Sequence, residues 1–234
     1  MAEQPKPDWW YDDLRQVGLD FDDPGAVAVY DRNQGDRTAE NEALAARLGL
    51  GPGRLVVEFG CGTGSFARAA ARAGAGVRAV DVSAAMLAFA EERTRREGLA
   101  VAFHRAGFLS YRHDGGPADA VVSQFALHHL PDFWKGQALA RIAALLRPGG
   151  LFYLRDVVFG FAPAAAREGV EAWIGAVAEP EGAGFTRADF AGHVRDEHST
   201  YDFLLEALLQ RCGFEIEERW QSLGAYAAYL CRRR

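Results

Sequence analysis

The sequence predicts an α/β protein with a doubly wound sheet of seven mostly parallel strands. Short apolar runs alternate with amphipathic, alanine-rich stretches through the middle of the chain, a pattern typical of βαβ units. A glycine-rich segment, residues 60–64, directly follows the first apolar run. The last two runs are separated only by residues 222–225, which is short enough for a hairpin and predicts an antiparallel pair at the C-terminus.

Five apolar runs predict the parallel strands, and the near-continuous apolarity of the fifth suits burial on both faces of a sheet. They are residues 55–59, 77–82, 99–104, 118–125 and 151–158. Helices are expected at residues 66–73, from an N-cap at Ser83 to residue 96, at residues 131–146 before Pro148-Gly149-Gly150, and at residues 201–212. The closing strands are expected at residues 215–221 and 226–231.

Two segments lie outside this alternation, and we expect a single domain over residues 1–234. Residues 1–50 are expected to form a helical N-terminal segment with breaks at Pro24-Gly25 and Gly35. Residues 160–199 are expected to form a helical lid, with helices at residues 163–178 and 186–195. Both segments are predicted to cover the carboxyl edge of the sheet, where open α/β sheets bind their ligands.

Composition excludes several classes of protein. The 234 residues are 49% hydrophobic and 25% charged, which is typical of a globular chain. A formal charge of −6 and a pI near 5.6 disfavour a nucleic-acid partner. No apolar run is long enough for a membrane span, and the first residues do not resemble a signal peptide. Cys61, Cys212 and Cys231 are few and scattered, so we expect no disulfide framework, no metal site and a cytoplasmic protein. A monomer or homodimer is expected.

The glycine-rich turn predicts a ligand with a ribose and a positively charged group. Asp81, at the end of the second run, is placed to accept hydrogen bonds from two ribose hydroxyls. Glu58 lies within an apolar strand, where a carboxylate needs a hydrogen-bonding or cationic partner. The dinucleotide pattern is not matched because its sixth position is Ser65, and no Gly-Lys-Ser/Thr follows as in a P-loop. A tight turn without a ligand would carry the same glycines.

Four motifs in order resemble the class I S-adenosylmethionine-dependent methyltransferases. They are residues 57–64, residues 79–83 with Met86, residues 118–123 with 126–130, and residues 146–151. The resemblance implies a Rossmann-like fold, S-adenosylmethionine as cofactor and S-adenosylhomocysteine as product. It also implies cofactor-binding roles for one set of residues: Tyr30, Glu58, Gly60, Cys61, Gly62, Asp81, Val82, Met86, Gly107, Phe108, Gln124 and Phe125.

Within that set the resemblance assigns each part of the cofactor to a different stretch of chain. Glu58 and the glycine turn would hold the methionine part, Asp81 the ribose, and Val82 and Met86 the adenine. The family often has an acid after its third strand that accepts from the adenine amino group. Gly107 stands at that position here, so we expect backbone groups and packing by Phe108 to replace this contact.

Candidate catalytic residues follow the fourth strand and interrupt the fifth. Methyl transfer to a weakly acidic nucleophile needs a nearby base, and histidine is the natural candidate. His128 and His129 lie at the correct edge of the sheet, and Asp156 interrupts an apolar strand together with Arg155. Local packing would account for the same histidines. His193 and His198 are expected as lid residues in contact with solvent.

The acidic balance and the helical insertion favour a small-molecule acceptor. O-, N- and C-methylation stay open. A second hypothesis is a binding module that retains the cofactor pocket without catalysis, and a third is a nicotinamide-dependent oxidoreductase, against which the glycine spacing and the antiparallel C-terminal pair count.

Overall fold

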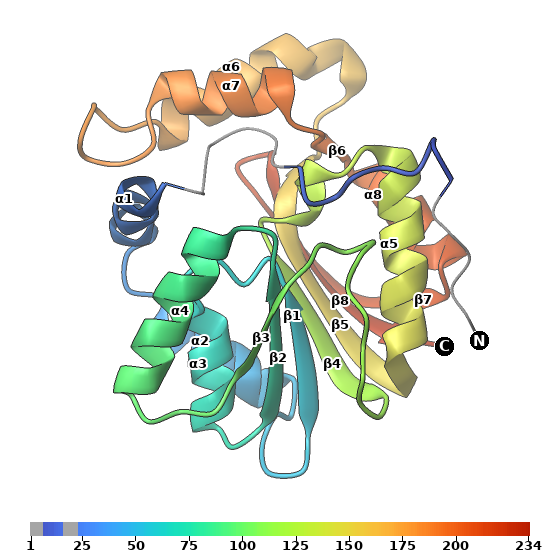
Figure 1. Ribbon diagram of the computed structural model, residues 1–234. Coiled ribbons are helices and arrows are strands. Elements are labelled where there is room, and N and C mark those ends of the chain that lie inside the picture. Colours follow the sequence, from blue (N-terminus) through green and yellow to red (C-terminus); the bar gives the residue numbers. More distant parts are fainter. Residues whose placement is uncertain (1–6, 16–22) are drawn as a thin grey trace.

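The computed structural model describes residues 7–15 and 23–234, and their centre is a twisted sheet covered by helices on both faces (Figure 1). The strands are ordered β3-β2-β1-β4-β5-β8-β7. Neighbours from β3 to β5 are parallel, whereas β8 runs antiparallel to both β5 and β7. After β1, the chain adds β2 and β3 on one side of β1 and then β4 and β5 on its other side. Such a switch point between β1 and β4 opens a crevice for a ligand at the carboxyl ends of the strands.

The predicted strands are present. Their bounds are β1 Leu55–Phe59, β2 Gly76–Asp81, β3 Ala102–Arg105, β4 Ala118–Gln124, β5 Leu146–Phe159, β7 Phe214–Ser222 and β8 Tyr226–Arg233. The fold class is therefore confirmed, including the single antiparallel strand near the C-terminus. A two-residue strand that was not predicted, β6 Thr200–Tyr201, pairs with the end of β5.

Alternation along each strand divides the core into two layers. On β1, Val57 and Phe59 face a cluster that includes residues of α5 Asp132–Leu145 and α8 Asp202–Arg211. Val56 faces the opposite cluster, which includes residues of α2 Thr38–Arg47 and α3 Ser65–Arg72. Both faces are apolar because both are covered, as expected for a parallel sheet.

Two helix boundaries follow directly from local chemistry. Helix α4, Ala84–Arg96, begins at the predicted cap, where the Ser83 hydroxyl accepts from Met86 N at 3.0 Å. Helix α1, Pro24–Gln34, begins where Asp23 caps the first turn and ends at Gly35, which has φ +66°. The N-terminal segment is thus helical over α1 and α2, but residues 7–15 are not helical, and residues 1–6 and 16–22 lie outside the described part of the chain.

Strand β5 is longer than predicted. Pro148-Gly149-Gly150 was expected to be a turn that ends the preceding helix, but the strand already begins at Leu146, which pairs with Ala118. A register shift between Ala118 and Ala120 accommodates the extra residues. Gly150 makes this possible because an added Cβ would lie 2.9 Å from the Arg147 carbonyl oxygen.

The insertion after β5 forms two helices, α6 Ala166–Val177 and α7 Arg187–Asp196. Figure 1 shows them lying together across the carboxyl edge of the sheet, with α1 at one side. The short 3-10 turn η2, Pro163–Ala165, replaces the predicted first turn of α6. Within residues 7–15 and 23–234, no helix combines the length and apolarity that crossing a membrane requires.

Candidate active site

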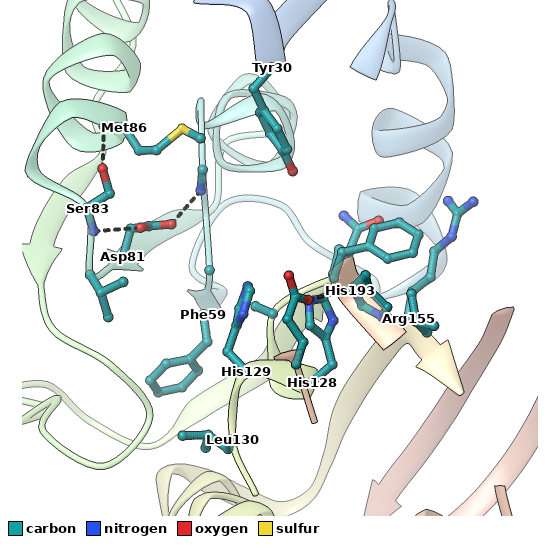
Figure 2. Close-up of a pocket in the computed structure, with 18 of the residues that line it drawn as sticks. Tyr30, Phe59, Asp81, Ser83, Met86, His128, His129, Leu130, Arg155 and His193 are labelled. Atoms are coloured by element: carbon teal, nitrogen blue, oxygen red, sulfur yellow. Dashed lines mark hydrogen bonds and ion pairs between the residues drawn. The ribbon is translucent and has the colours of Figure 1, made fainter. Parts of the chain in front are cut away.

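A cavity of about 600 Å³ lies at the carboxyl edge of the sheet, beneath the α6–α7 insertion. We call it the main cavity. It is within the size range of small-molecule sites. Figure 2 shows Asp81, Ser83 and Met86 on one side and His128, His129, His193 and Arg155 on the other. The residues predicted at the ends of β2 and β4 therefore face one space.

Asp81 organises the end of β2 and the glycine turn. Its Oδ2 accepts from Gly62 N at 2.8 Å, and its Oδ1 accepts from Ser83 N at 2.9 Å (Figure 2). A carboxylate can accept about four hydrogen bonds in total. Val82 and the buried Met86 line the main cavity beside it, as the sequence predicts.

The glycines of the turn are required by backbone geometry. Gly60 has φ +69°, and an added Cβ would lie 2.2 Å from the Cβ of Ala126. Gly62 has φ +51°, yet an added Cβ would meet no protein atom within 4 Å. Gly60 thus permits close packing of the chain, whereas Gly62 borders open space that a ligand can enter.

Glu58 and Cys61 do not line the main cavity. Both line a second cavity of about 440 Å³, which shares Gly60, Gly62 and Phe125 with the main one. Burial, together with the nearby charge of Asp81, raises the pKa of Glu58 well above its usual value, although the backbone N–H of Ala67 donates to it. Its Oε2 is buried with no hydrogen-bond partner, which leaves an acceptor for a cationic or N–H-bearing ligand group.

The place of the missing acid at Gly107 is taken by a side chain from the N-terminal segment. An added Cβ on Gly107 would lie 2.3 Å from Asp13 Oδ2. That oxygen accepts from Leu109 N at 2.7 Å and from Ser110 N at 3.0 Å. Oδ1 of Asp13 is buried without a hydrogen-bond partner, and Asp13 lines the main cavity. The absent side chain at Gly107 therefore makes room for a carboxylate that is distant in sequence.

The other predicted cofactor residues surround this space. Phe108 stacks on Phe59 with ring centroids 4.9 Å apart. Tyr30 reaches the main cavity from α1, and burial raises the pKa of its hydroxyl to about 12. Gln124 and Phe125 border both cavities. Phe125 has a positive φ of 55°, which is uncommon for a residue with a side chain and is frequent at functional sites.

His128 and Asp156 form a buried ion pair. The Nδ1–H of His128 donates to Asp156 Oδ1, and His128 N donates to Asp156 Oδ2 at 3.0 Å. Glu197, at the end of α7, places Oε2 3.0 Å from Nε2 of the same ring. Burial by itself would lower the pKa of His128, but Asp156 and Glu197 outweigh it and raise the pKa to about 9. Asp156 lies behind His128 and is not among the cavity-lining residues.

His129 lies beside His128 in the opposite electrostatic state. Burial, and then the charge of His128, lower the pKa of His129 to about 3, so its ring is neutral. The ring centroids of the two histidines are 4.3 Å apart, and Nδ1 of His129 is buried without a hydrogen-bond partner. The structure thus places one charged and one neutral imidazole at the wall of the main cavity.

Sequence reasoning missed Asp13, Glu197 and Arg37 among the residues that line the main cavity. Asp13 carries no local signal because its partners are about 95 residues away in the sequence. Glu197 follows His193 by four positions on α7, a spacing that indicates a shared helix face and could have been noticed. Arg37 and Arg155 both lie over the Phe125 ring and both pair with Glu40. His193, expected in solvent, instead lines the main cavity.

Comparisons with known proteins agree with this geometry. Residues 56–150 match the family model described as a methyltransferase domain. An uncharacterized methyltransferase of Geobacillus kaustophilus is 31% identical over 189 residues, which cover 81% of this chain and 82% of that protein. Methyltransferase GfsG of Streptomyces halstedii is 34% identical over 50% of this chain and 42% of its own length.

Solved structures share the fold at lower identity. The CcbJ methyltransferase of Streptomyces caelestis has a TM-score of 0.67 at 19% identity, covering 88% of this chain and 95% of that one. Magnesium protoporphyrin IX methyltransferase of Synechocystis, with bound S-adenosylhomocysteine, has a TM-score of 0.65 at 19% identity, covering 92% and 96%. From the identity and coverage of the Geobacillus relative, this chain belongs to the methyltransferase family.

Proposed function

We propose that the protein transfers a methyl group from S-adenosylmethionine to a small-molecule acceptor by direct displacement. The observation that carries this proposal is the main cavity itself. It runs from the Asp81 carboxylate and the glycine turn to a wall of histidines, aromatic rings and Arg155 under the lid. Direct displacement needs alignment of the acceptor, methyl group and sulfur with water excluded, and a lidded cavity provides both.

The polar groups along the main cavity and the adjoining second cavity fit the parts of S-adenosylmethionine in order. Asp81 is placed for the ribose hydroxyls, beside Val82 and Met86. The unpartnered Oε2 of Glu58, past the glycine turn, suits the ammonium of the methionine part. Glu58 would repel a pyrophosphate, so the same geometry disfavours a dinucleotide. Gln124 and Phe125 would then lie near the transferred methyl group.

Adenine recognition is assigned to Asp13 in place of the acid absent at Gly107. Ala106 N donates to the Asp81 carbonyl oxygen at 3.0 Å, so the segment holding Gly107 lies next to the ribose-binding strand end. Asp13 Oδ2 is occupied by backbone N–H groups, whereas Oδ1 has no partner. An exocyclic amino group is a donor that would satisfy this buried acceptor.

At the end of the main cavity proposed for the methyl acceptor, His128 has no ring nitrogen available to take a proton. Asp156 and Glu197 hold the two nitrogens of His128, which gives Asp156 a positioning role. His129 is then a candidate for contact with the acceptor rather than for proton transfer, because a pKa of about 3 makes its ring a weak base. The three cysteines are free, which supports a cytoplasmic location, and the lid supports a small molecule over nucleic acid or membrane as partner. We infer a monomer or homodimer.

The test is turnover against a library of small phenols, amines, carboxylic acids and activated carbon acids. Formation of S-adenosylhomocysteine together with a product heavier by one methylene would support the proposal, and Asp81→Ala should slow this turnover about 5- to 150-fold at subsaturating cofactor. Tight cofactor binding without turnover of any acceptor would favour a non-catalytic binding module. Binding of a nicotinamide cofactor in place of S-adenosylmethionine would overturn the proposal.

A further inference from the structure

A cluster of three side chains joins the end of the lid to the floor of the main cavity. His128 comes from the 3-10 turn η1, Leu127–His129, that follows β4. His193 and Glu197 come from the last turn of α7 and the residue that ends it. One ligand atom from each residue lies within 4.8 Å of the others, and all three residues line the cavity. We propose that this cluster binds a divalent first-row transition metal, with Zn²⁺ as the best match.

His128 is oriented as metal-binding histidines are. Its Nδ1–H donates to the buried Asp156, whose second oxygen accepts from the His128 backbone N–H. This arrangement fixes the ring and directs Nε2 toward Glu197. A carboxylate behind the far nitrogen is the usual second-shell support of a histidine ligand because it sets the tautomer and raises the basicity of the ligating nitrogen.

His193 has the same kind of support on its other side. Its Nε2 lies 2.7 Å from the Ser199 hydroxyl, so Nδ1 is the nitrogen that faces Glu197. The four-residue spacing of His193 and Glu197 places both donors on one face of α7. Two ligands from one helix turn and a third from another element make a common plan for a metal site.

Glu197 supplies the observation that points to a cation. Its side chain is 9% exposed, and Oε2 is buried without a hydrogen bond of good geometry. That oxygen lies 3.0 Å from His128 Nε2 and 2.6 Å from His193 Nδ1. A buried carboxylate oxygen against two ring nitrogens is stabilised by positive charge, which the protonated His128 ring carries while the site is empty and which a metal ion carries once it displaces that proton. Metal binding requires the nitrogen and oxygen donors to move apart by about 0.5 Å, because the ligand atoms of a tetrahedral zinc ion are further from one another than these donors are.

The donor set selects the class of metal. Two imidazoles and one carboxylate form the ligand set of catalytic zinc sites that keep an open position, whereas Mg²⁺ and Ca²⁺ prefer all-oxygen sites. The open position here would face the main cavity. If the proposed methyl transfer is correct, a metal at this point would polarise an oxygen of the acceptor and lower its pKa. Metal binding itself does not depend on that function.

The experiment is titration of the full-length, metal-stripped protein with Zn²⁺ by calorimetry and with Co²⁺ by visible absorption. We expect one equivalent bound with micromolar or tighter affinity, and ligand-field bands for a Co²⁺ ion of low coordination number. His193→Ala and Glu197→Gln should each weaken binding at least 10-fold, and Asp156→Asn, which acts through His128, should weaken it 10- to 100-fold. His198→Ala is the matched control, since this neighbouring histidine lies outside the cluster.

The outcomes separate the metal site from the proposed function. S-adenosylhomocysteine affinity is measured on the same variants, and its retention in His193→Ala shows that the fold is intact. No Zn²⁺ or Co²⁺ binding by the wild-type chain would overturn the site. Equal weakening in His198→Ala would also overturn it, because adventitious surface binding would then explain the signal. Metal binding in a protein that binds no cofactor would uphold the site and refute the proposed function.

Discussion

At the scale of single residues, two buried carboxylate oxygens without hydrogen-bond partners carry the account of cofactor binding. Oδ1 of Asp13 and Oε2 of Glu58 are both buried without hydrogen-bond partners. Such groups are costly in a stable core. We propose that the cofactor completes both acceptors, Asp13 at the adenine end and Glu58 at the ammonium end.

Asp13→Asn should change the base that the proposed adenine pocket prefers, from adenine toward hypoxanthine. The variant's amide oxygen would take the two backbone N–H donors now held by Oδ2, which turns its NH₂ toward the ligand's amino group. We expect affinity for S-adenosylhomocysteine to fall about 10-fold or more, and affinity for S-inosylhomocysteine, which has an oxygen there, to rise. Calorimetric titration with both compounds checks this. Equal losses for both would reduce Asp13 to a structural anchor of the loop.

Glu58→Gln should stabilise the ligand-free protein in a pH-dependent way. The folded-state pKa of Glu58 is raised by burial and by Asp81, so the ionised carboxylate destabilises the fold above that pKa. As pH falls through the folded pKa toward about 4.5, the folded state takes up the proton first and the penalty disappears. We expect the variant to be the more stable protein at high pH, with the difference vanishing near pH 4.5.

Denaturant unfolding of both proteins across this pH range measures the effect. A difference that grows as pH falls would have the wrong sign and would contradict the burial argument. The same variant should bind S-adenosylmethionine more weakly, because it lacks a charge for the ammonium group. Its gain in stability and loss of affinity would then come from the same atom.

At the scale of elements, α7 carries lid residues that line the main cavity, and the stability of this helix depends on the cap at its first turn. The Thr186 hydroxyl accepts from Asp189 N, and Asp189 Oδ2 accepts from Thr186 N at 2.7 Å, forming a capping box. Thr186→Ala should cost about 0.5–2 kcal/mol locally. Amide exchange over Arg187–Asp196 should accelerate, while Thr186→Ser, which keeps the hydroxyl, should behave as wild type. Unchanged exchange in the alanine variant would show that tertiary contacts alone hold α7.

The elements also show how far the sequence predicts this molecule. The Ser83 cap, the helix break at Gly35 and the positions of the strands along the chain follow from local chemistry and apolar periodicity, so they are predictable. The β5 extension through Pro148-Gly149-Gly150 is not, since it depends on pairing with Ala118 of β4. Asp13 and Glu197 reach the site only through tertiary contacts, so the pattern around Gly60 and Asp81 could not reveal them. The cofactor and catalytic assignments stay predictions until tested.

At the scale of the whole molecule, the main cavity is bounded by parts of the chain that are distant in sequence. The N-terminal segment supplies Asp13, α1 supplies Tyr30, the sheet edge supplies Asp81, and the lid supplies Phe190. A ligand that contacts all of them binds the folded state alone. Binding should therefore stabilise the fold as a whole by mass action.

We expect S-adenosylhomocysteine at 100 times its dissociation constant to stabilise the protein by about 2.7 kcal/mol. For a chain of this length that corresponds to a rise in Tm of about 5–10 °C. Differential scanning fluorimetry over a range of concentrations checks both the size and the logarithmic dependence. At the same concentration, adenosine should raise the Tm less than S-adenosylhomocysteine does, since adenosine lacks the ammonium that Glu58 would bind. A shift of equal size with adenosine would argue against the assigned role of Glu58.

The central claim is that this cavity binds S-adenosylmethionine through Asp81. The most direct test is calorimetric titration of the wild-type chain and of Asp81→Ala with S-adenosylmethionine and S-adenosylhomocysteine. The account predicts one site with micromolar affinity for both compounds, weakened in the variant by about 1–3 kcal/mol. Absence of binding by the wild-type chain, or an unchanged dissociation constant in a folded Asp81→Ala variant, would contradict it.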